Sequence, residues 1–125
     1  MTVALMLNRK AGTGRANRLA DYVFDQFSKN GIDYIFVEAT SAQDAIEKAS
    51  AIAHQVEAFV AVGGDGSVHT AAQVAWKHKL PLGIIASGSG DDIARACGLP
   101  HGRRFTHIQK AVDHFVESWL KRDIS

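Results

Sequence analysis

Short apolar runs alternate along the chain with longer stretches in which apolar residues recur every three or four positions. The runs are continuous, as expected of strands covered on both faces, and they occupy residues 3–7, 34–37, 59–62 and 82–85. The periodic stretches have the spacing of amphipathic helices and occupy residues 16–27, 42–53, 68–76 and 108–120. We expect a further short helix over residues 92–97. This alternation predicts an α/β fold with three layers, in which a mostly parallel sheet lies between helices.

Signals at the ends of the helices agree with this pattern. Asn30 and Gly31 end the first helix, because glycine tolerates the left-handed backbone of a helix C-cap. Thr40 or Ser41 can cap the second helix, with Asp44 in the capping-box position after Ser41. We expect the third helix to begin near Ser67 and to bury one apolar face. That face consists of Val68, Ala71, Ala72, Ala75 and Trp76.

Composition indicates one ordinary globular domain, since 46% of the 125 residues are hydrophobic and 22% are charged. The net charge of +1 argues against a nucleic-acid partner. The one cysteine, Cys97, lies among apolar residues and is interpreted as a packing residue in a reducing, cytoplasmic protein. The six histidines lack the spacing of zinc ligands and favour surface positions. No segment reaches the roughly 18 apolar residues of a membrane span.

The end of the chain predicts a cut at a domain boundary, with a frayed natural C-terminus as the alternative. Residues 121–125 follow a complete helix and resemble the approach to another strand. The last helix carries one apolar stripe, made of Ile108, Phe115, Trp119 and Leu120 with Val112 and Val116 beside it. If this stripe or the neighbouring sheet edge lacks its cover, the domain self-associates or leaves Trp119 exposed to solvent.

The candidate chemistry lies in the segments that follow the strands, which are residues 8–15, 38–41, 63–67 and 86–92. In a parallel sheet these segments share the carboxyl edge, where open α/β sheets bind ligands. Three of them are rich in glycine and lead into a helix. Glycine lets backbone N–H groups approach an oxyanion closely, and a helix N-terminus adds attraction. Three such loops suit a polyphosphate, although glycine-rich turns alone would also join strands to helices.

Two familiar nucleotide motifs are absent. The sequence contains neither G-x-x-x-x-G-K-[ST] nor G-x-G-x-x-G, so a P-loop is excluded and a dinucleotide-binding motif is disfavoured. The segment Gly63-Gly64-Asp65-Gly66-Ser67 instead combines three glycines with a carboxylate, which is more than a tight turn requires.

Three segments together resemble the catalytic domain of the diacylglycerol kinase and sphingosine kinase superfamily. That family carries N-P-x-A-G, G-G-D-G-T and G-T-x-N-D-[FL]-A-R. The corresponding segments here are Asn8-Arg9-Lys10-Ala11-Gly12, Gly63 to Ser67, and Gly88-Ser89-Gly90-Asp91-Asp92-Ile93-Ala94-Arg95. The resemblance covers residues 3 to about 100. The G-G-D-G motif is shared with NAD kinases, whereas residues 88–95 point to the lipid kinases.

The resemblance implies a Rossmann-like, ATP-binding lipid kinase domain over residues 1–125, without the β-rich C-terminal domain that forms the lipid pocket in the family. Asp65 would be the catalytic or Mg²⁺-linked carboxylate, with Mg²⁺ bound through ATP. The alternative for Asp65 is a cap on the third helix. The nucleotide-binding residues implied are Asn8, Arg9, Lys10, Ala11, Gly12, Thr40, Gly63, Gly64, Asp65, Gly66, Ser67, Gly88, Ser89 and Asp92.

Three departures from the family pattern keep other functions open. Arg9 stands where the family has proline, Thr70 where it often has glutamate, and Asp91 where it has asparagine. A kinase of another G-G-D-G group and a nucleotide-binding module without catalysis are the alternatives. The partners implied are ATP, a lipid acceptor with diacylglycerol- or sphingoid-like chemistry reached through the absent domain, a peripheral membrane contact and a second copy of the chain.

Overall fold

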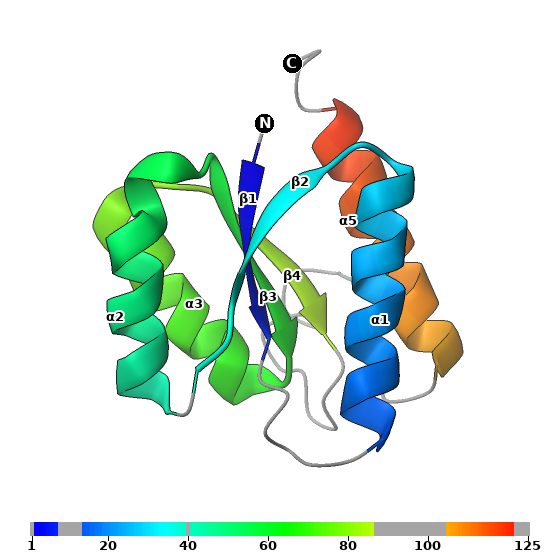
Figure 1. Cartoon of the computed structure of the whole chain (residues 1–125), viewed down its shortest axis with the longest axis horizontal. Helices are drawn as coiled ribbons and strands as arrows, with labels where there is room; N and C mark the ends of the chain where they lie inside the picture. The colour runs from blue at the N-terminus through cyan, green and yellow to red at the C-terminus, as the bar shows by residue number, and fades with distance from the viewer. Residues whose placement is uncertain (1, 8–13, 40, 87–104, 122–125) are drawn as a thin grey trace.

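The computed structural model describes residues 2–7, 14–39, 41–86 and 105–121 (Figure 1). The strands are β1 (Thr2–Leu7), β2 (Asp33–Val37), β3 (Ala58–Gly63) and β4 (Leu82–Ala86). The helices are α1 (Gly14–Lys29), α2 (Ala42–Ile52), the 3₁₀ turn η2 (Ala53–Gln55), α3 (Asp65–His78) and α5 (Phe105–Lys121). The short helix expected over residues 92–97 lies outside the described residues.

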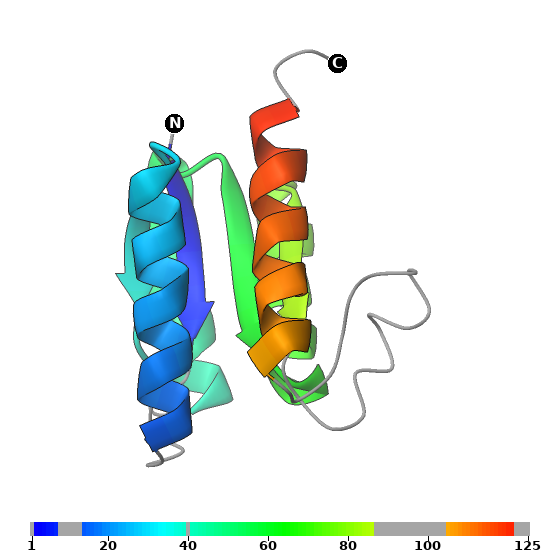
Figure 2. The ribbon, with the colours of Figure 1, turned by 90° about the vertical axis from the view of Figure 1, so that its right-hand side faces the viewer.

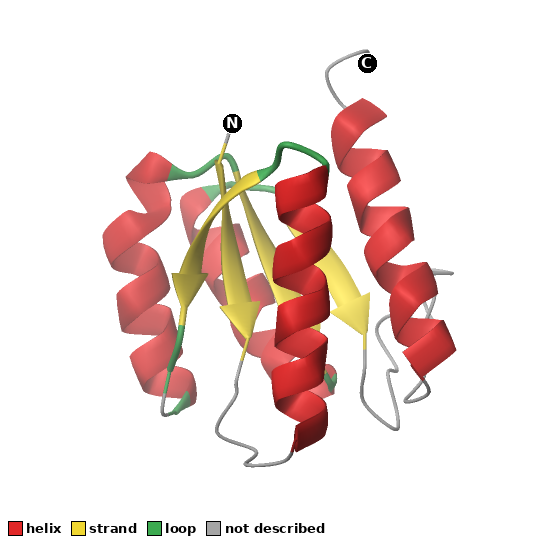
Figure 3. Cartoon of the chain, turned by 45° about the vertical axis from the view of Figure 1, so that its right-hand side comes forward, coloured by secondary structure: helices red, strands yellow, loops and turns green. Residues whose placement is uncertain are grey.

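The four strands form one parallel sheet with the order β2-β1-β3-β4. Leu5 of β1 is in register with Phe36 of β2 and with Val60 of β3. All four strands therefore end at the same edge of the sheet (Figure 3). In the sheet, β2 lies on the outer side of β1, and β4 lies on the outer side of β3 in the opposite direction. The point between β1 and β3 is thus the topological switch point, near which open α/β sheets bind ligands.

Helices cover both faces of the sheet, so the expected three-layer fold is confirmed. Helices α2 and α3 lie on one face, and α1 and α5 lie side by side on the other (Figures 1 and 2). The α1/α5 face is filled by aromatic rings, with Phe115 stacked on Phe27 at 5.4 Å and on Trp119 at 6.1 Å between ring centroids. The α2/α3 face is filled by smaller side chains around Phe59 and Val74.

The structure corrects three expectations about apolar side chains. Trp119 is only 7% exposed and packs in the core, so the prediction of a solvent-exposed Trp119 is wrong. Leu120 is 50% exposed because it lies one residue, about 100° of helix, beyond the buried side of α5. Trp76 is 87% exposed for the same reason, since α3 turns Val74 and Ala75 toward the sheet. The Ile108 side chain lies outside the described residues.

The helix ends follow the sequence with one shift. The Ser41 Oγ accepts a hydrogen bond of 3.1 Å from the Asp44 backbone N–H, so Ser41 is the cap of α2 among the two predicted residues. Gly31 follows α1 with a positive φ of 69°, as expected of a glycine C-cap. Helix α3 begins at Asp65 rather than near Ser67, with Gly64 as its N-cap. The glycine-rich segment after β3 is therefore partly helical.

Candidate functional site

The carboxyl edge of the sheet holds the candidate site. Strands β1, β2 and β3 end there at Leu7, Val37 and Gly63. The structure describes most of the segment after β2 and all of the segment after β3, and these two segments line one pocket, as the parallel sheet predicted. Residues 8–13 after β1 and residues 87–92 after β4 lie outside the described residues.

The turn from β3 into α3 depends on glycine at position 63. Gly63 has φ of +145°, a backbone conformation that residues with a side chain rarely adopt. A Cβ atom added there would also lie 3.0 Å from the Ser67 Oγ. The backbone therefore passes very close to the first turn of α3, and this sharp entry directs the helix N-terminus along the carboxyl edge.

The N-terminus of α3 presents backbone donors without a side-chain cap. Gly64 has extended backbone and, as a glycine, offers no side-chain acceptor. The first intrahelical bond runs from the Val68 N–H to the Gly64 carbonyl at 3.1 Å. The N–H groups of residues 65–67 thus have no acceptor within the helix, and they lie at the positive end of its dipole. This arrangement suits an anion. Asp65 is the first residue of the helix and not its cap, so the capping interpretation of Asp65 is wrong.

A pocket of about 340 Å³ opens beside this helix end, on the α2/α3 side of the sheet. Its size lies at the lower end of the range for small-molecule sites. Its walls come from the ends of β1 and β2 and from the first turns of α2 and α3. They comprise Met6, Leu7, Val37, Ala39, Ser41, Ala42, Ala45, Gly66, Ser67 and Thr70. The N-termini of two helices therefore meet at one pocket.

The pocket has apolar walls and three hydroxyl groups. The Ser41 hydroxyl is engaged with the N–H of Asp44, and the Thr70 Oγ1 donates to the Gly66 carbonyl at 3.0 Å. Gly66 itself leaves space, because a Cβ added there would meet no described atom within 4 Å. Packing of the described residues thus does not explain why position 66 is glycine, whereas room for a ligand would.

Of the predicted site residues, Gly66 and Ser67 line the pocket, Gly63 and Gly64 form the turn, and Asp65 is half-buried at the start of α3. The other predicted residues lie outside the described residues and stay predictions. These are Asn8, Arg9, Lys10, Ala11, Gly12, Thr40, Gly88, Ser89 and Asp92. Sequence reasoning missed the apolar walls, whose only signal is that Met6 and Val37 stand at strand ends.

Among the described residues, the side chains with a shifted pKa lie away from this pocket. Burial raises the pKa of the Tyr22 phenol, and the carboxylates of Asp113 and Asp25 raise it further. The hydrogen bond that Lys121 donates at 2.7 Å, together with its charge, lowers the pKa of the Glu117 carboxyl. All five residues belong to α1 or α5, on the opposite face of the sheet from the pocket.

Two further findings concern the described ranges alone. Within residues 2–7, 14–39, 41–86 and 105–121, no three side chains of His, Cys, Asp or Glu gather into a group that could hold a metal ion. Among the same residues, no helix combines the length and the apolar character needed to cross a bilayer.

Comparison with known proteins gives matches over almost the whole chain. The family model described as the diacylglycerol kinase catalytic domain matches residues 2–122. Two curated proteins named diacylglycerol kinase, from Mycobacterium tuberculosis strains CDC 1551 / Oshkosh and ATCC 25618 / H37Rv, are each 34% identical over 120 residues. These matches cover 95% of this chain and 38% of each relative, so the chain spans well under half of the relatives' length. The similarity includes every element from β1 to α5.

Proposed function

Because the chain belongs to the diacylglycerol kinase catalytic domain family, we propose that it binds ATP at the carboxyl edge of its sheet as the nucleotide-binding part of a lipid kinase. In the reaction, an acceptor hydroxyl oxygen bonds to the γ-phosphorus of ATP, and the bond from that phosphorus to the bridging oxygen breaks. The products are a phosphorylated lipid, ADP and a proton. The acceptor class we propose is diacylglycerol- or sphingoid-like.

The turn from Gly63 to Ser67 carries this proposal. The backbone at Gly63 has a φ that residues with a side chain rarely adopt, and Gly64 leaves the first N–H groups of α3 without a side-chain cap. These donors suit phosphate oxygens, since phosphoryl transfer depends mainly on positioning and on neutralising charge. The apolar pocket bounded by Met6 and Val37 lies next to the same turn and suits the less polar nucleoside. Residues 8–12, Thr40, Gly88, Ser89 and Asp92 would complete the phosphate site.

Asp65 fits the Mg²⁺ that accompanies ATP. Mg²⁺ is commonly held by one or two carboxylates together with the oxygens of substrate phosphates. Asp65 supplies one carboxylate at the first position of α3, beside the proposed phosphate site. We propose that it binds Mg–ATP or receives the proton of the acceptor hydroxyl.

A second candidate function is nucleotide binding without catalysis, and Thr70 favours it. Where the family often has a carboxylate, the Thr70 hydroxyl lines the pocket and donates to the Gly66 carbonyl. A carboxylate there could contact the metal ion, whereas this hydroxyl is engaged with the backbone. The two functions differ in how far Mg²⁺ strengthens binding of ATP, and Thr70→Glu should enlarge that effect if the site is catalytic.

Titration calorimetry with Mg–ATP tests the proposal. We expect binding by the folded chain, and we expect Gly64→Val to abolish it by filling the space through which the phosphate approaches the backbone. Circular dichroism and thermal melting of the variant distinguish a blocked site from an unfolded protein. Absence of binding by folded wild-type protein at millimolar Mg–ATP would refute the proposal.

The chain alone is expected to phosphorylate no lipid, because it spans only 38% of the length of the relatives named for that activity. The assay is transfer of radiolabel from ATP to diacylglycerol or sphingosine in mixed micelles. Turnover that requires Asp65 would show that the lipid site lies within these 125 residues.

A further inference from the structure

The outer edge of β2 faces away from the rest of the described sheet. Strand β2 pairs with β1 on one side only, and no other described strand lies on its second side. Figure 1 shows β2 in front of the sheet, with no described helix or loop drawn across it. The backbone N–H and C=O groups on that side have no ladder partner among the described strands. Such an edge is a template for pairing with another strand.

The sequence of β2 does not protect this edge. Natural proteins block edge strands with proline, lysine or a bulge. Strand β2 contains no proline or lysine, and all five of its residues are in regular register with β1. Its centre is Tyr34-Ile35-Phe36, and all three side chains are only half-buried. Phe24 of α1 stacks on Tyr34 at 5.2 Å between ring centroids and contacts Phe36 edge-on at 5.3 Å. An aromatic cluster therefore lies beside the open edge.

We propose that β2 pairs in antiparallel orientation with β2 of a second copy of this chain, in a register centred on Ile35. A two-fold axis normal to the sheet then joins two four-stranded sheets into one. In this register Tyr34 of each copy lies opposite Phe36 of the other. Both side chains face the α1/α5 side of the sheet, so the pairing forms two aromatic pairs on one face.

Charged side chains on the α2/α3 face favour the same partner and the same register. Side chains alternate along a strand, so Asp33 shares the α2/α3 face with Ile35 and Val37. Asp33 is exposed and has no ion-pair partner among the described residues. In the proposed register it lies opposite Val37 of the second copy, next to the point where that copy's β2 ends.

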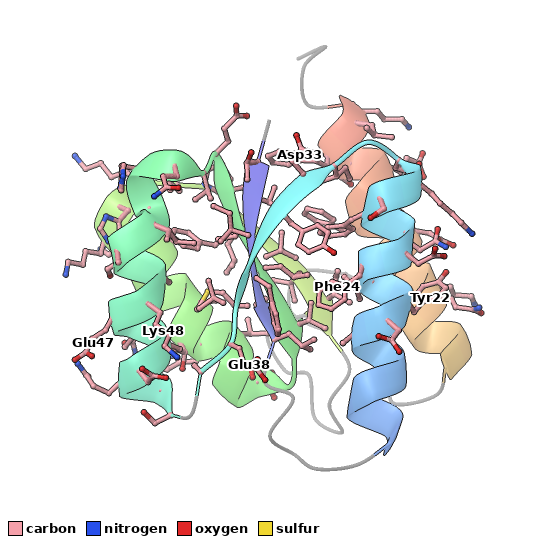
Figure 4. All side chains as sticks on the ribbon, in the orientation of Figure 1. Tyr22, Phe24, Asp33, Glu38, Glu47 and Lys48 are labelled. Carbon is pink, nitrogen blue, oxygen red and sulfur yellow. The ribbon has the colours of Figure 1, made fainter. Side chains whose placement is uncertain are left out.

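Lys48 supplies a positive charge at the end of β2. The Lys48 Nζ donates to the Glu38 carbonyl at 2.8 Å and contacts the Asp44 carboxylate at 3.0 Å. Figure 4 shows Lys48 directed from α2 toward the end of β2, with Asp33 at the opposite end of the strand. An ammonium has three N–H donors, so one remains for Asp33 of the second copy. Two-fold symmetry forms this ion pair twice, which no parallel pairing of the same strands would do.

The first test is sedimentation analysis without nucleotide, so its outcome is independent of ATP binding. We expect the wild-type chain to form dimers and Asp33→Lys to raise the dissociation constant about tenfold or more, because two ion pairs become two repulsions. Asp33→Lys combined with Lys48→Glu should restore dimerisation. The matched control is Glu47→Lys, which has the same change in charge on α2 but points away from β2 in Figure 4 and should have no effect.

A cross-link tests the register. In a Cys97→Ser background, Asp33→Cys combined with Lys48→Cys should give covalent dimers on mild oxidation, because these positions meet only between copies. Circular dichroism verifies that each variant is folded. A wild-type chain that stays monomeric at its highest soluble concentration would overturn the proposal. So would dimers that neither respond to Asp33→Lys nor cross-link between positions 33 and 48.

Discussion

Gly66→Ala separates the stability of the fold from binding at the pocket. Gly66 is the second residue of α3, where an added Cβ would meet no described atom within 4 Å. Alanine is favoured over glycine in a helix by up to about 1 kcal/mol, and somewhat less near a helix end. For a domain of this size, we therefore expect Gly66→Ala to leave the melting temperature unchanged or to raise it by about 3–5 °C.

Binding of ATP should change in the opposite direction. Gly66 lines the pocket together with Ser67 and Thr70, so the added methyl group would occupy space that the nucleotide requires. Overpacking at a close contact costs about 1–2 kcal/mol, which corresponds to a loss of affinity of roughly tenfold. Differential scanning fluorimetry gives the stability of the variant, and calorimetry with Mg–ATP gives its affinity. A stable Gly66→Ala variant with unchanged affinity would refute the assignment of this pocket to the nucleotide.

Four other substitutions test the packing and the proposed metal chemistry. Gly83→Ala would place a Cβ 2.6 Å from the Phe115 Cδ1, within a stacked aromatic cluster. It should lower the free energy of unfolding in urea by about 2–3 kcal/mol. An unchanged urea midpoint would contradict the packing of α5 on β4. Gly63→Ala should cost about 1–3 kcal/mol through its φ of +145°, and Ser67→Ala should relieve only the steric part of that loss. Asp65→Asn should remove most of the gain in ATP affinity that Mg²⁺ provides, measured against EDTA. If Mg²⁺ raises the ATP affinity of the wild-type and variant proteins equally, Asp65 is excluded from metal binding.

The strands could be predicted because helices cover both faces of the sheet, which makes their apolar runs continuous. The buried faces of the helices were harder to predict from the sequence, as α3 and α5 show. Trp76 follows the buried Val74 and Ala75, and Leu120 follows the buried Trp119. Apolar spacing alone does not decide which neighbour faces the core, because adjacent positions differ by only about 100°. The direction from which each helix packs on the sheet decides it.

The glycine-rich part of the site was predictable for a local reason. A positive φ at Gly63 and an uncapped helix start at Gly64 are properties of consecutive residues, so the sequence segment contains them. The residues that form the pocket walls, in contrast, are far apart in the sequence. Met6, Val37 and Thr70 meet only because β1 lies between β2 and β3 in the sheet, and because α2 and α3 share one face. That juxtaposition depends on strand order, which the apolar pattern does not determine.

Amide chemical-shift mapping with Mg–ATP tests the central claim most directly. The ¹⁵N-labelled chain is titrated with Mg–ATP, and the shift of each backbone amide is followed. We predict the largest shifts at residues 64–67 and at the start of α2, where two helix N-termini meet at the pocket. Shifts concentrated at the far end of α3 near Trp76, or no shifts at millimolar Mg–ATP, would contradict nucleotide binding at the carboxyl edge of the sheet.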